Sequence, residues 1–185
     1  TMARTIIFSL EATLSAVARF WNREVDHLEV VDAICYDGTS DYDERTWMEK
    51  NGFRAREFTV TWDAARALLD RGAPFTLATA VPGRGHLQAV VGYDEARRTL
   101  LVRDPSSSYL CEYLAEGFLG DYRSTGPRGA ALVPAERADL LDGVELPDAE
   151  LYDLRYQAAM ALQRHDRATA ERCVAEMQSK AAGER

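Results

Sequence analysis

Cysteine is scarce in this 185-residue chain, which has only Cys35, Cys111 and Cys173, widely spaced and odd in number. They form neither a paired disulfide framework nor a Cys-x-x-Cys metal motif. Histidine also occurs only three times, on separate segments, without the spacing of metal ligands. These absences predict a reducing, cytoplasmic compartment and a protein without a metal or another cofactor.

The chain also lacks a surplus of positive charge, because 22 lysines and arginines stand against 30 acidic residues, for a formal net charge of -8. Binding to a phosphate backbone depends on clustered lysine and arginine, so no nucleic-acid partner is expected. No apolar run approaches the length of a membrane span, and the beginning "TMARTIIFSLEATLSAV" lacks a clear signal-peptide cleavage site. No membrane partner is expected either.

The first part of the chain has apolar residues at helical spacing, bounded by polar capping residues and glycines. These patterns predict helices over residues 9–22, 26–36, 40–52 and 61–72. An alternating apolar and polar pattern interrupts them at residues 53–60 and predicts a strand.

The next part of the chain is rich in residues that favour strands. Strands are predicted over residues 74–81, 86–94, 99–105 and 129–134. Helices followed by mostly antiparallel strands indicate an α+β fold, with N-terminal helices packed on an antiparallel sheet.

Composition changes at residues 134–148, which are rich in charge, proline and glycine and predict a linker. Residues 149–185 follow with two alanine-rich segments that predict a helical hairpin. The total length suits one domain with a core plus a small appendage. The predicted organisation is therefore a main domain over residues 1–133, the linker, and the hairpin.

A histidine and an aspartate are predicted to meet across one hairpin. In residues 86–104, placing Gly92 opposite Arg98 leaves a five-residue loop, "YDEAR", and sets His86 directly opposite Asp104. Their Cβ atoms would then lie about 4.5 to 5.5 Å apart on one face. A carboxylate on one ring nitrogen fixes the tautomer of a histidine base and stabilises its imidazolium form. The alternative is a purely structural pair, and a slip of one residue would separate the two side chains.

The segment "GAPFTLATAVPGRGHLQAVVGYDEARRTLLVRDP" resembles the second half of the C39-type cysteine peptidase domain, which has a papain-like fold. In that family a Gly-His strand carries the catalytic histidine and a following Asp-Pro carries the aspartate. The resemblance covers roughly residues 5–133. It implies the papain-like version of the α+β fold, with His86 as the base and Asp104 as the acid that orients it.

The same resemblance implies a nucleophile at the beginning of the first core helix. There "SLEATLSAV" corresponds to the family's Pro-Ala-Thr-Leu-like segment through Ala12, Thr13 and Leu14, so the cysteine position is Ser9. A helix N-terminus activates a thiol, but a serine hydroxyl is far from ionising. The segment before Ser9 also lacks the family's oxyanion-hole glutamine, and Glu11 adds a negative charge.

These observations favour a degenerate cysteine-peptidase-like domain that binds a peptide or protein and is not an enzyme. The alternatives are an active hydrolase or acyl transferase, which uses Ser9 or derives from a cysteine-bearing parent, and a structural domain in which Ser9 only caps its helix. Gln88 shares the face of His86 and is predicted to contact substrate in the same cleft, unless it is only a sheet-face glutamine. Cys35 is expected to be a buried structural residue, because a helix end opposes a thiolate.

The final segment "LRYQAAMALQRHDRATAERCVAEM" resembles one tetratricopeptide repeat, with Leu154, Ala158, Ala170 and Val174 at positions that pack one helix on the other. One such hairpin is too small to bury its own apolar face. The resemblance therefore implies contact with the main domain or with further helical repeats after residue 185, which would bind a partner.

Overall fold

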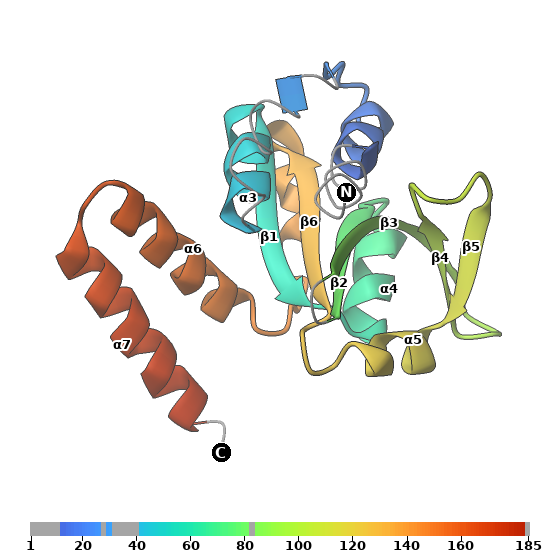
Figure 1. The fold of residues 1–185 in the computed structure, drawn as a ribbon. Coiled ribbons are helices and arrows are strands. Elements are labelled where there is room, and N and C mark those ends of the chain that lie inside the picture. Colours follow the sequence, from blue (N-terminus) through green and yellow to red (C-terminus); the bar gives the residue numbers. More distant parts are fainter. Residues whose placement is uncertain (1–11, 27–28, 31–40, 82–83, 184–185) are drawn as a thin grey trace. The chain divides into compact units, whose positions relative to one another are not determined.

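The structure is a computed structural model that describes residues 12–26, 29–30, 41–81 and 84–183. The chain divides into two compact units, residues 1–147 and residues 148–185, and the fold of each is drawn in Figure 1. Most of the helix predicted over residues 26–36 lies outside the described residues. Within the described residues, no helix is long and apolar enough to cross a membrane.

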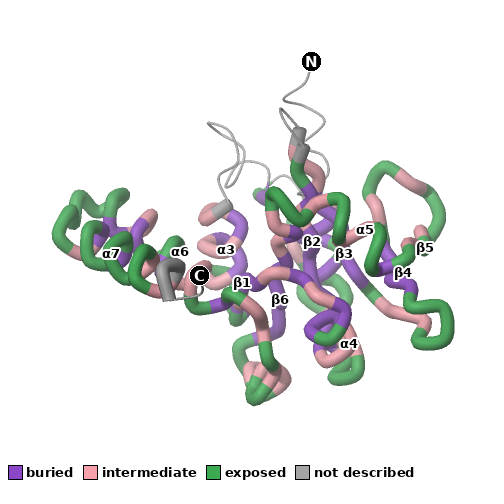
Figure 2. The backbone as a smooth tube through the Cα atoms, turned by 90° about the horizontal axis from the view of Figure 1, so that it is seen from below, coloured by how far each residue is buried: buried purple, intermediate pink, exposed green. Residues whose placement is uncertain are grey.

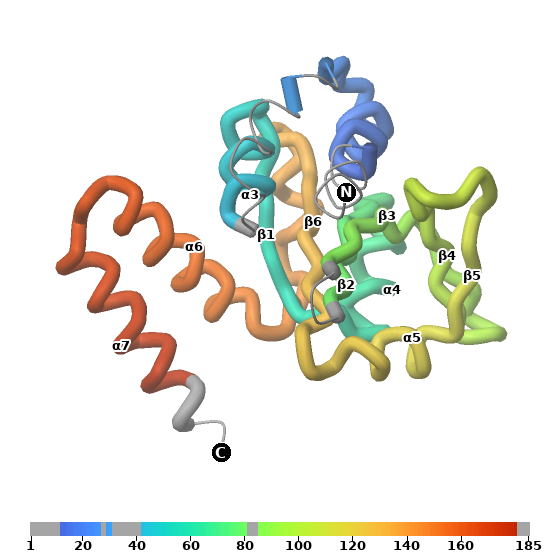
Figure 3. Tube along the Cα trace, viewed as in Figure 1, coloured from blue at the N-terminus to red at the C-terminus, as the bar shows by residue number. Residues whose placement is uncertain are grey.

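The described residues of the first unit form a six-stranded sheet in which all neighbouring strands are antiparallel, in the order β1-β6-β2-β3-β4-β5. Figure 3 shows that β6, late in the chain, lies between β1 and β2. The strands are β1 (Phe53–Thr59), β2 (Phe75–Val81), β3 (Arg84–Asp94), β4 (Thr99–Arg103), β5 (Leu110–Leu114) and β6 (Arg128–Pro134). This sheet with its helices confirms the predicted α+β class, although β5 was not predicted.

The helices that accompany this sheet include α3 (Asp41–Lys50), α4 (Trp62–Asp70), α5 (Ala115–Asp121) and the 3-10 helix η1 (Ala135–Leu141). A further helix is described over residues 12–20. At the beginning of α4, Thr61 Oγ1 accepts a hydrogen bond from Ala64 N at 3.2 Å. Gly72, with φ +70°, follows the end of α4, as the predicted glycine stop requires. The sequence did not predict α5 or η1.

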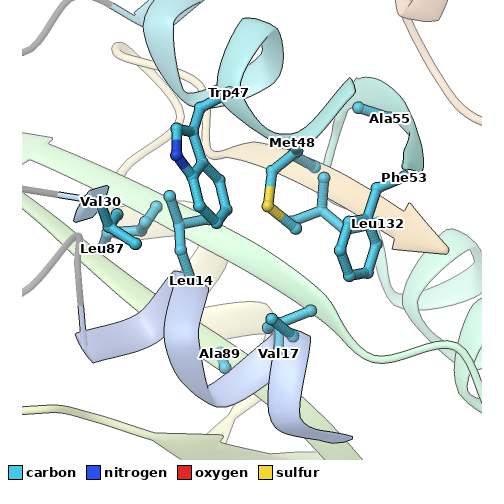
Figure 4. Close-up of a cluster of buried hydrophobic side chains, with 12 residues drawn as sticks. Leu14, Val17, Val30, Trp47, Met48, Phe53, Ala55, Leu87, Ala89 and Leu132 are labelled. Carbon is cyan, nitrogen blue, oxygen red and sulfur yellow. The ribbon is translucent and has the colours of Figure 1, made fainter. Parts of the chain in front are cut away.

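One face of the sheet is covered by the helix over residues 12–20 and by α3 (Figure 4). Leu14 and Val17 from the first helix pack with Trp47 and Met48 from α3. The strands contribute Phe53, Ala55, Leu87, Ala89, Ala130 and Leu132. Because side chains alternate along a strand, Val90, next to Ala89, points to the other face, where α4 contacts the strand. Figure 2 shows this burial concentrated in the middle of the sheet.

The predicted register of the β3–β4 hairpin is wrong. Gly92 lies opposite Leu101 rather than Arg98, and a bulge shifts the pairing between Val90 and Gly92. The strands continue into the predicted loop because Asp94 closes a tighter turn, in which its Oδ1 accepts a hydrogen bond from Arg97 N at 2.9 Å. Extending the pairing of Val90 with Val102 by two residues would place Gln88, not His86, opposite Asp104.

The segment predicted as a linker, residues 134–148, contains η1 and bonds to both ends of β1. Ala135 N donates to Gly52 O at 2.9 Å, and Thr59 N donates to Pro147 O at 2.8 Å. The boundary between the two compact units follows directly, between residues 147 and 148.

The second unit consists of α6 (Ala149–Gln163) and α7 (Arg167–Gly183), which pack on each other. Asp166 begins α7, and its Oδ1 accepts a hydrogen bond from Thr169 N at 3.1 Å. The buried contact consists of Leu154, Ala158 and Cys173, with Met177 against them. Val174, predicted at a packing position, is 43% exposed, because the packed face of α7 runs through its neighbour Cys173.

Candidate functional site

His86 and Asp104 meet in the first unit, as the sequence predicted. His86 lies in β3 and Asp104 directly follows β4, and His86 Nε2 lies 2.9 Å from Asp104 Oδ2. Their side chains are 25% and 15% exposed, so solvent reaches the pair only in part. With the observed register the two residues are diagonal neighbours on one face, a separation that a long side chain spans.

The charge of Asp104 determines which nitrogen of His86 carries the proton. Partial burial acts to raise the pKa of Asp104, but hydrogen bonds from His86 and from Ser106 N, the latter at 2.7 Å, outweigh it and lower the pKa below its usual value. An ionised carboxylate only accepts hydrogen bonds, so the ring proton of neutral His86 lies on Nε2. Nδ1, which no described residue bonds, is left as the basic nitrogen.

The helix over residues 12–20 is bonded to this strand through Thr13. Thr13 Oγ1 donates to Leu87 O at 3.1 Å, and this hydrogen bond is buried. Leu87 adjoins His86, and both precede the paired part of β3 and β4, which begins at Ala89. The first described turn of the helix therefore lies where β3 is no longer paired with β4.

Gln88 is buried at 3% exposure on the same face as His86. Its amide nitrogen donates to Thr79 Oγ1 at 3.4 Å, whereas its Oε1 has no hydrogen-bond partner among the described residues. Gln88 lines one pocket together with His86 and Asp104. The structure thus brings three of the predicted site residues together.

The pocket has a volume of about 590 Å³, and residues of β5 and α5 form an aromatic wall in it. Tyr113 from β5 stacks on Phe118 from α5, with ring centroids 4.4 Å apart and planes 9° apart. The rings of Phe118 and Tyr122 meet edge to face, with their centroids 5.6 Å apart. Burial raises the pKa of Tyr113 to about 12, with smaller contributions from Cys111 and Asp104, so its phenol stays neutral at physiological pH.

Sequence reasoning missed this aromatic wall. The available signal was the concentration of aromatic residues in "YLCEYLAEGFLGDY", residues 109–122, with Phe118 and Tyr122 one helical turn apart. Asp121 also lines the pocket, and Glu112 joins it from β5.

Several predicted site features fall outside the described residues. Ser9, the predicted nucleophile position, is one of them, as are Glu11 and Cys35. Among the residues that the structure describes, no group of three or more histidine, cysteine, aspartate or glutamate side chains has an arrangement that would hold a metal ion.

Residues 11–130 match the model of the Peptidase_C39 like family, which is most of the first unit. The chain belongs to this family. The match confirms the predicted C39-like domain. It ends before the second unit, so the resemblance of α6 and α7 to a tetratricopeptide repeat stays a prediction. No curated protein matches the chain.

Three solved structures are similar to this C39-like domain. The peptidase domain of Streptococcus ComA, a bi-functional ABC transporter of a quorum-sensing pathway, has a TM-score of 0.53 at 18% identity, over 69% of this chain and 91% of that one. The N-terminal peptidase C39 like domain of a toxin secretion ATP-binding protein from Vibrio parahaemolyticus has a TM-score of 0.52 at 14% identity, over 68% and 96%. A double glycine motif protease from an AMS/PCAT transporter, in complex with the leader peptide, has a TM-score of 0.52 at 15% identity, over 69% and 85%. These likenesses confirm the peptidase-like fold.

Proposed function

We propose that this C39-like domain binds a peptide or an extended protein segment and has lost the cleavage chemistry of its family. The observation that carries the proposal is the hydrogen-bonded pair of His86 and Asp104, with Nε2 and Oδ2 2.9 Å apart, in the lining of a pocket. The sequence has a serine, Ser9, at the predicted nucleophile position. A helix N-terminus does little to activate a serine hydroxyl as a nucleophile, so Ser9 would not attack a bound peptide bond. The pair of His86 and Asp104 would then only orient the bound segment. The similar double glycine motif protease in complex with its leader peptide supports a peptide as the ligand.

An active hydrolase or acyl transferase is the second candidate, and one observation favours it. Nδ1 of His86 bonds no described residue, while Asp104 accepts from Nε2. A basic nitrogen in this state is able to take a proton from a nucleophile. Ser9, or a cysteine in an active parent, would be that nucleophile. Thr13, which follows Ser9 by four residues, bonds the backbone of Leu87, the residue after His86.

A Ser9→Cys variant distinguishes these proposals from a domain with no site. If the cleft geometry is intact, iodoacetamide labels the new cysteine much faster than Cys111, which is partly exposed and serves as an internal reference for peptide mapping. Adding His86→Asn abolishes this rapid labelling, since the thiol loses its base. The matched control is His165→Asn, an exposed histidine in the turn between α6 and α7, whose φ of +58° suits asparagine.

Two results would contradict the proposal. A Ser9→Cys thiol no more reactive than Cys111 removes the predicted site altogether. Hydrolysis of peptide or thioester substrates by the unaltered chain, lost in Ser9→Ala, replaces the degenerate domain with the active enzyme. Both measurements use all 185 residues.

A further inference from the structure

The pocket beside His86 contains an acceptor without a donor. Gln88 lines it, is nine-tenths buried or more, and its Oε1 accepts no hydrogen bond from any described residue. A buried carbonyl oxygen without a donor costs free energy, because it has lost water and gained no partner. A ligand that brings an N–H group to Gln88 recovers that cost.

Three carboxylates surround the same pocket: Asp104, Glu112 and Asp121. Asp104 accepts from His86 and Ser106, and Glu112 accepts from Thr99 Oγ1 at 2.6 Å and pairs with Arg97 at 3.1 Å. The third carboxylate, Asp121, is exposed and has no bonded partner among the described residues. Carboxylates outnumber the cations that bond them, so the pocket is negative and rich in acceptors.

Aromatic rings from β5, α5 and the residue after α5 also line the pocket. The rings of Tyr113 and Phe118 are stacked almost in parallel, and the ring centroid of Tyr122 lies 5.6 Å from that of Phe118. Aromatic rings attract cations through their negative faces, and the planar guanidinium stacks on them better than an ammonium does. Acceptors and aromatic rings around one pocket suit a flat, positively charged donor.

We infer that this pocket holds the cationic side chain of an arginine, and less tightly of a lysine, in the bound peptide. The inference rests on the peptide binding proposed above. A guanidinium has five N–H donors for Gln88 Oε1 and the carboxylates. An anionic side chain would meet three carboxylates, and an apolar side chain would leave Gln88 Oε1 without a donor.

The test is a titration of the 15N-labelled chain with capped pentapeptides, followed by NMR. The peptides are acetyl-Ala-Ala-Xaa-Ala-Ala-amide with arginine, citrulline or leucine at the centre. Citrulline has the length and planarity of arginine without the charge. We expect the arginine peptide to bind at least about tenfold more tightly than the citrulline peptide, with shifts at the Gln88 side-chain amide and at Tyr113 and Phe118.

Two variants test whether the arginine peptide binds in this pocket. Asp121→Asn removes an exposed charge without a core contact, and lowers affinity for the arginine peptide several-fold while leaving the leucine peptide unaffected. Gln88→Leu keeps the buried volume, removes the acceptor, and has the same selective effect. Asp139→Asn, an exposed aspartate in η1, is the matched control and leaves all affinities unchanged.

The possible failures are distinct. Equal affinity for the three peptides, with shifts in the pocket, overturns the preference for a cation and leaves peptide binding intact. Arginine-dependent shifts confined to residues outside the pocket also overturn the inference. No shift with any peptide contradicts the proposed peptide binding itself.

Discussion

Thr13 and Leu87, separated by 74 positions in the chain, are joined by a buried hydrogen bond of 3.1 Å from the hydroxyl of one to the carbonyl oxygen of the other. The bond fixes the beginning of the first described helix on β3, beside His86. It is thus a link between the segment that follows Ser9 and the strand that carries the proposed base.

Replacing this donor tests the link. Thr13→Val keeps the shape but leaves Leu87 O buried without a donor, so the free energy of unfolding falls by about 1–3 kcal/mol, measured by urea denaturation. In the Ser9→Cys background the same change slows iodoacetamide labelling. Thr13→Ser keeps the hydroxyl and restores both values toward those of threonine. An unchanged labelling rate in Thr13→Val would show that the hydrogen bond does not position the helix.

Arg128 neutralises two buried carboxylates beneath α3. Its guanidinium bonds Glu44 at 2.9 Å and Glu57 at 2.5 Å, and these acids are 1% and 4% exposed. Burial raises the pKa of Glu57, although the positive charge of Arg128 acts to lower it. Arg128→Met removes the cation that both carboxylates share, leaves Glu57 with its longer pair to Arg45 at 3.8 Å, and lowers the free energy of unfolding by about 3–5 kcal/mol.

The control for Arg128 is Arg66→Met, which breaks an exposed pair with Glu95 at 3.5 Å. Exposed pairs contribute about 0–1 kcal/mol, so this variant stays close to the unaltered chain. Equal effects of the two substitutions in a denaturant titration would mean that the buried cluster is not a stabilising network.

The lowered pKa of Asp104 predicts that the stability of the protein depends on pH. Its pKa is lowered in the folded state, because hydrogen bonds from His86 and Ser106 N outweigh the opposite effect of burial. A lowered carboxyl pKa contributes stability that is fully present above its ordinary value of 3.8 and is lost as pH falls through the lower, folded value. The unaltered chain therefore exceeds Asp104→Asn in stability at pH 7, and the difference shrinks below about pH 3.8.

Chemical denaturation at several pH values measures this difference. The exposed Asp139→Asn variant, which alters no site contact, serves as the reference and differs little from the unaltered chain throughout. A difference for Asp104→Asn that stays constant from pH 7 to the acid range would contradict the assigned hydrogen bonds.

Gly129 occupies a place in β6 where no side chain fits. A Cβ there would lie 2.6 Å from Val60 Cγ2 and 2.8 Å from Phe58 Cζ, both part of the packed core. Gly129→Ala therefore lowers the free energy of unfolding by about 1–3 kcal/mol, because overpacking forces the neighbours to move. Gly85→Ala in β3 meets nothing within 4 Å and is the matched control for a strand glycine. Similar melting temperatures for the two variants would contradict the close packing around Gly129.

The sequence predicts the local parts of this site better than their assembly. Alternation along the strands was enough to put His86 and Asp104 on one face, because the side-chain period of two survives an even shift of register. The exact pairing was wrong, since it depends on the turn that Asp94 closes and on the bulge before Gly92. The turn and the bulge each depend on a few local contacts, which produce no repeating pattern in the sequence.

The missed wall of the pocket has a different reason. Residues Leu110–Leu114 have every second side chain exposed, and the strand depends on pairing with β4 rather than on a buried apolar face. The short helix α5 has only Ala115 fully buried. Tyr113 and Phe118 come from separate elements, so their stacking is a tertiary contact that composition alone does not reveal.

The position of β6 determines when the first unit is able to fold during synthesis. Within the described sheet, β1 and β2 each pair with β6 and not with each other, so the sheet has a gap until residues 128–134 are available. A ribosome that has released the histidine strand and the whole aromatic wall still carries a chain without the strand that joins β1 to β2. Such long-range pairing makes folding slow and leaves the edges of β1 and β2 exposed to other chains in the meantime. A truncation before β6 is therefore expected to aggregate rather than to yield a smaller binding domain.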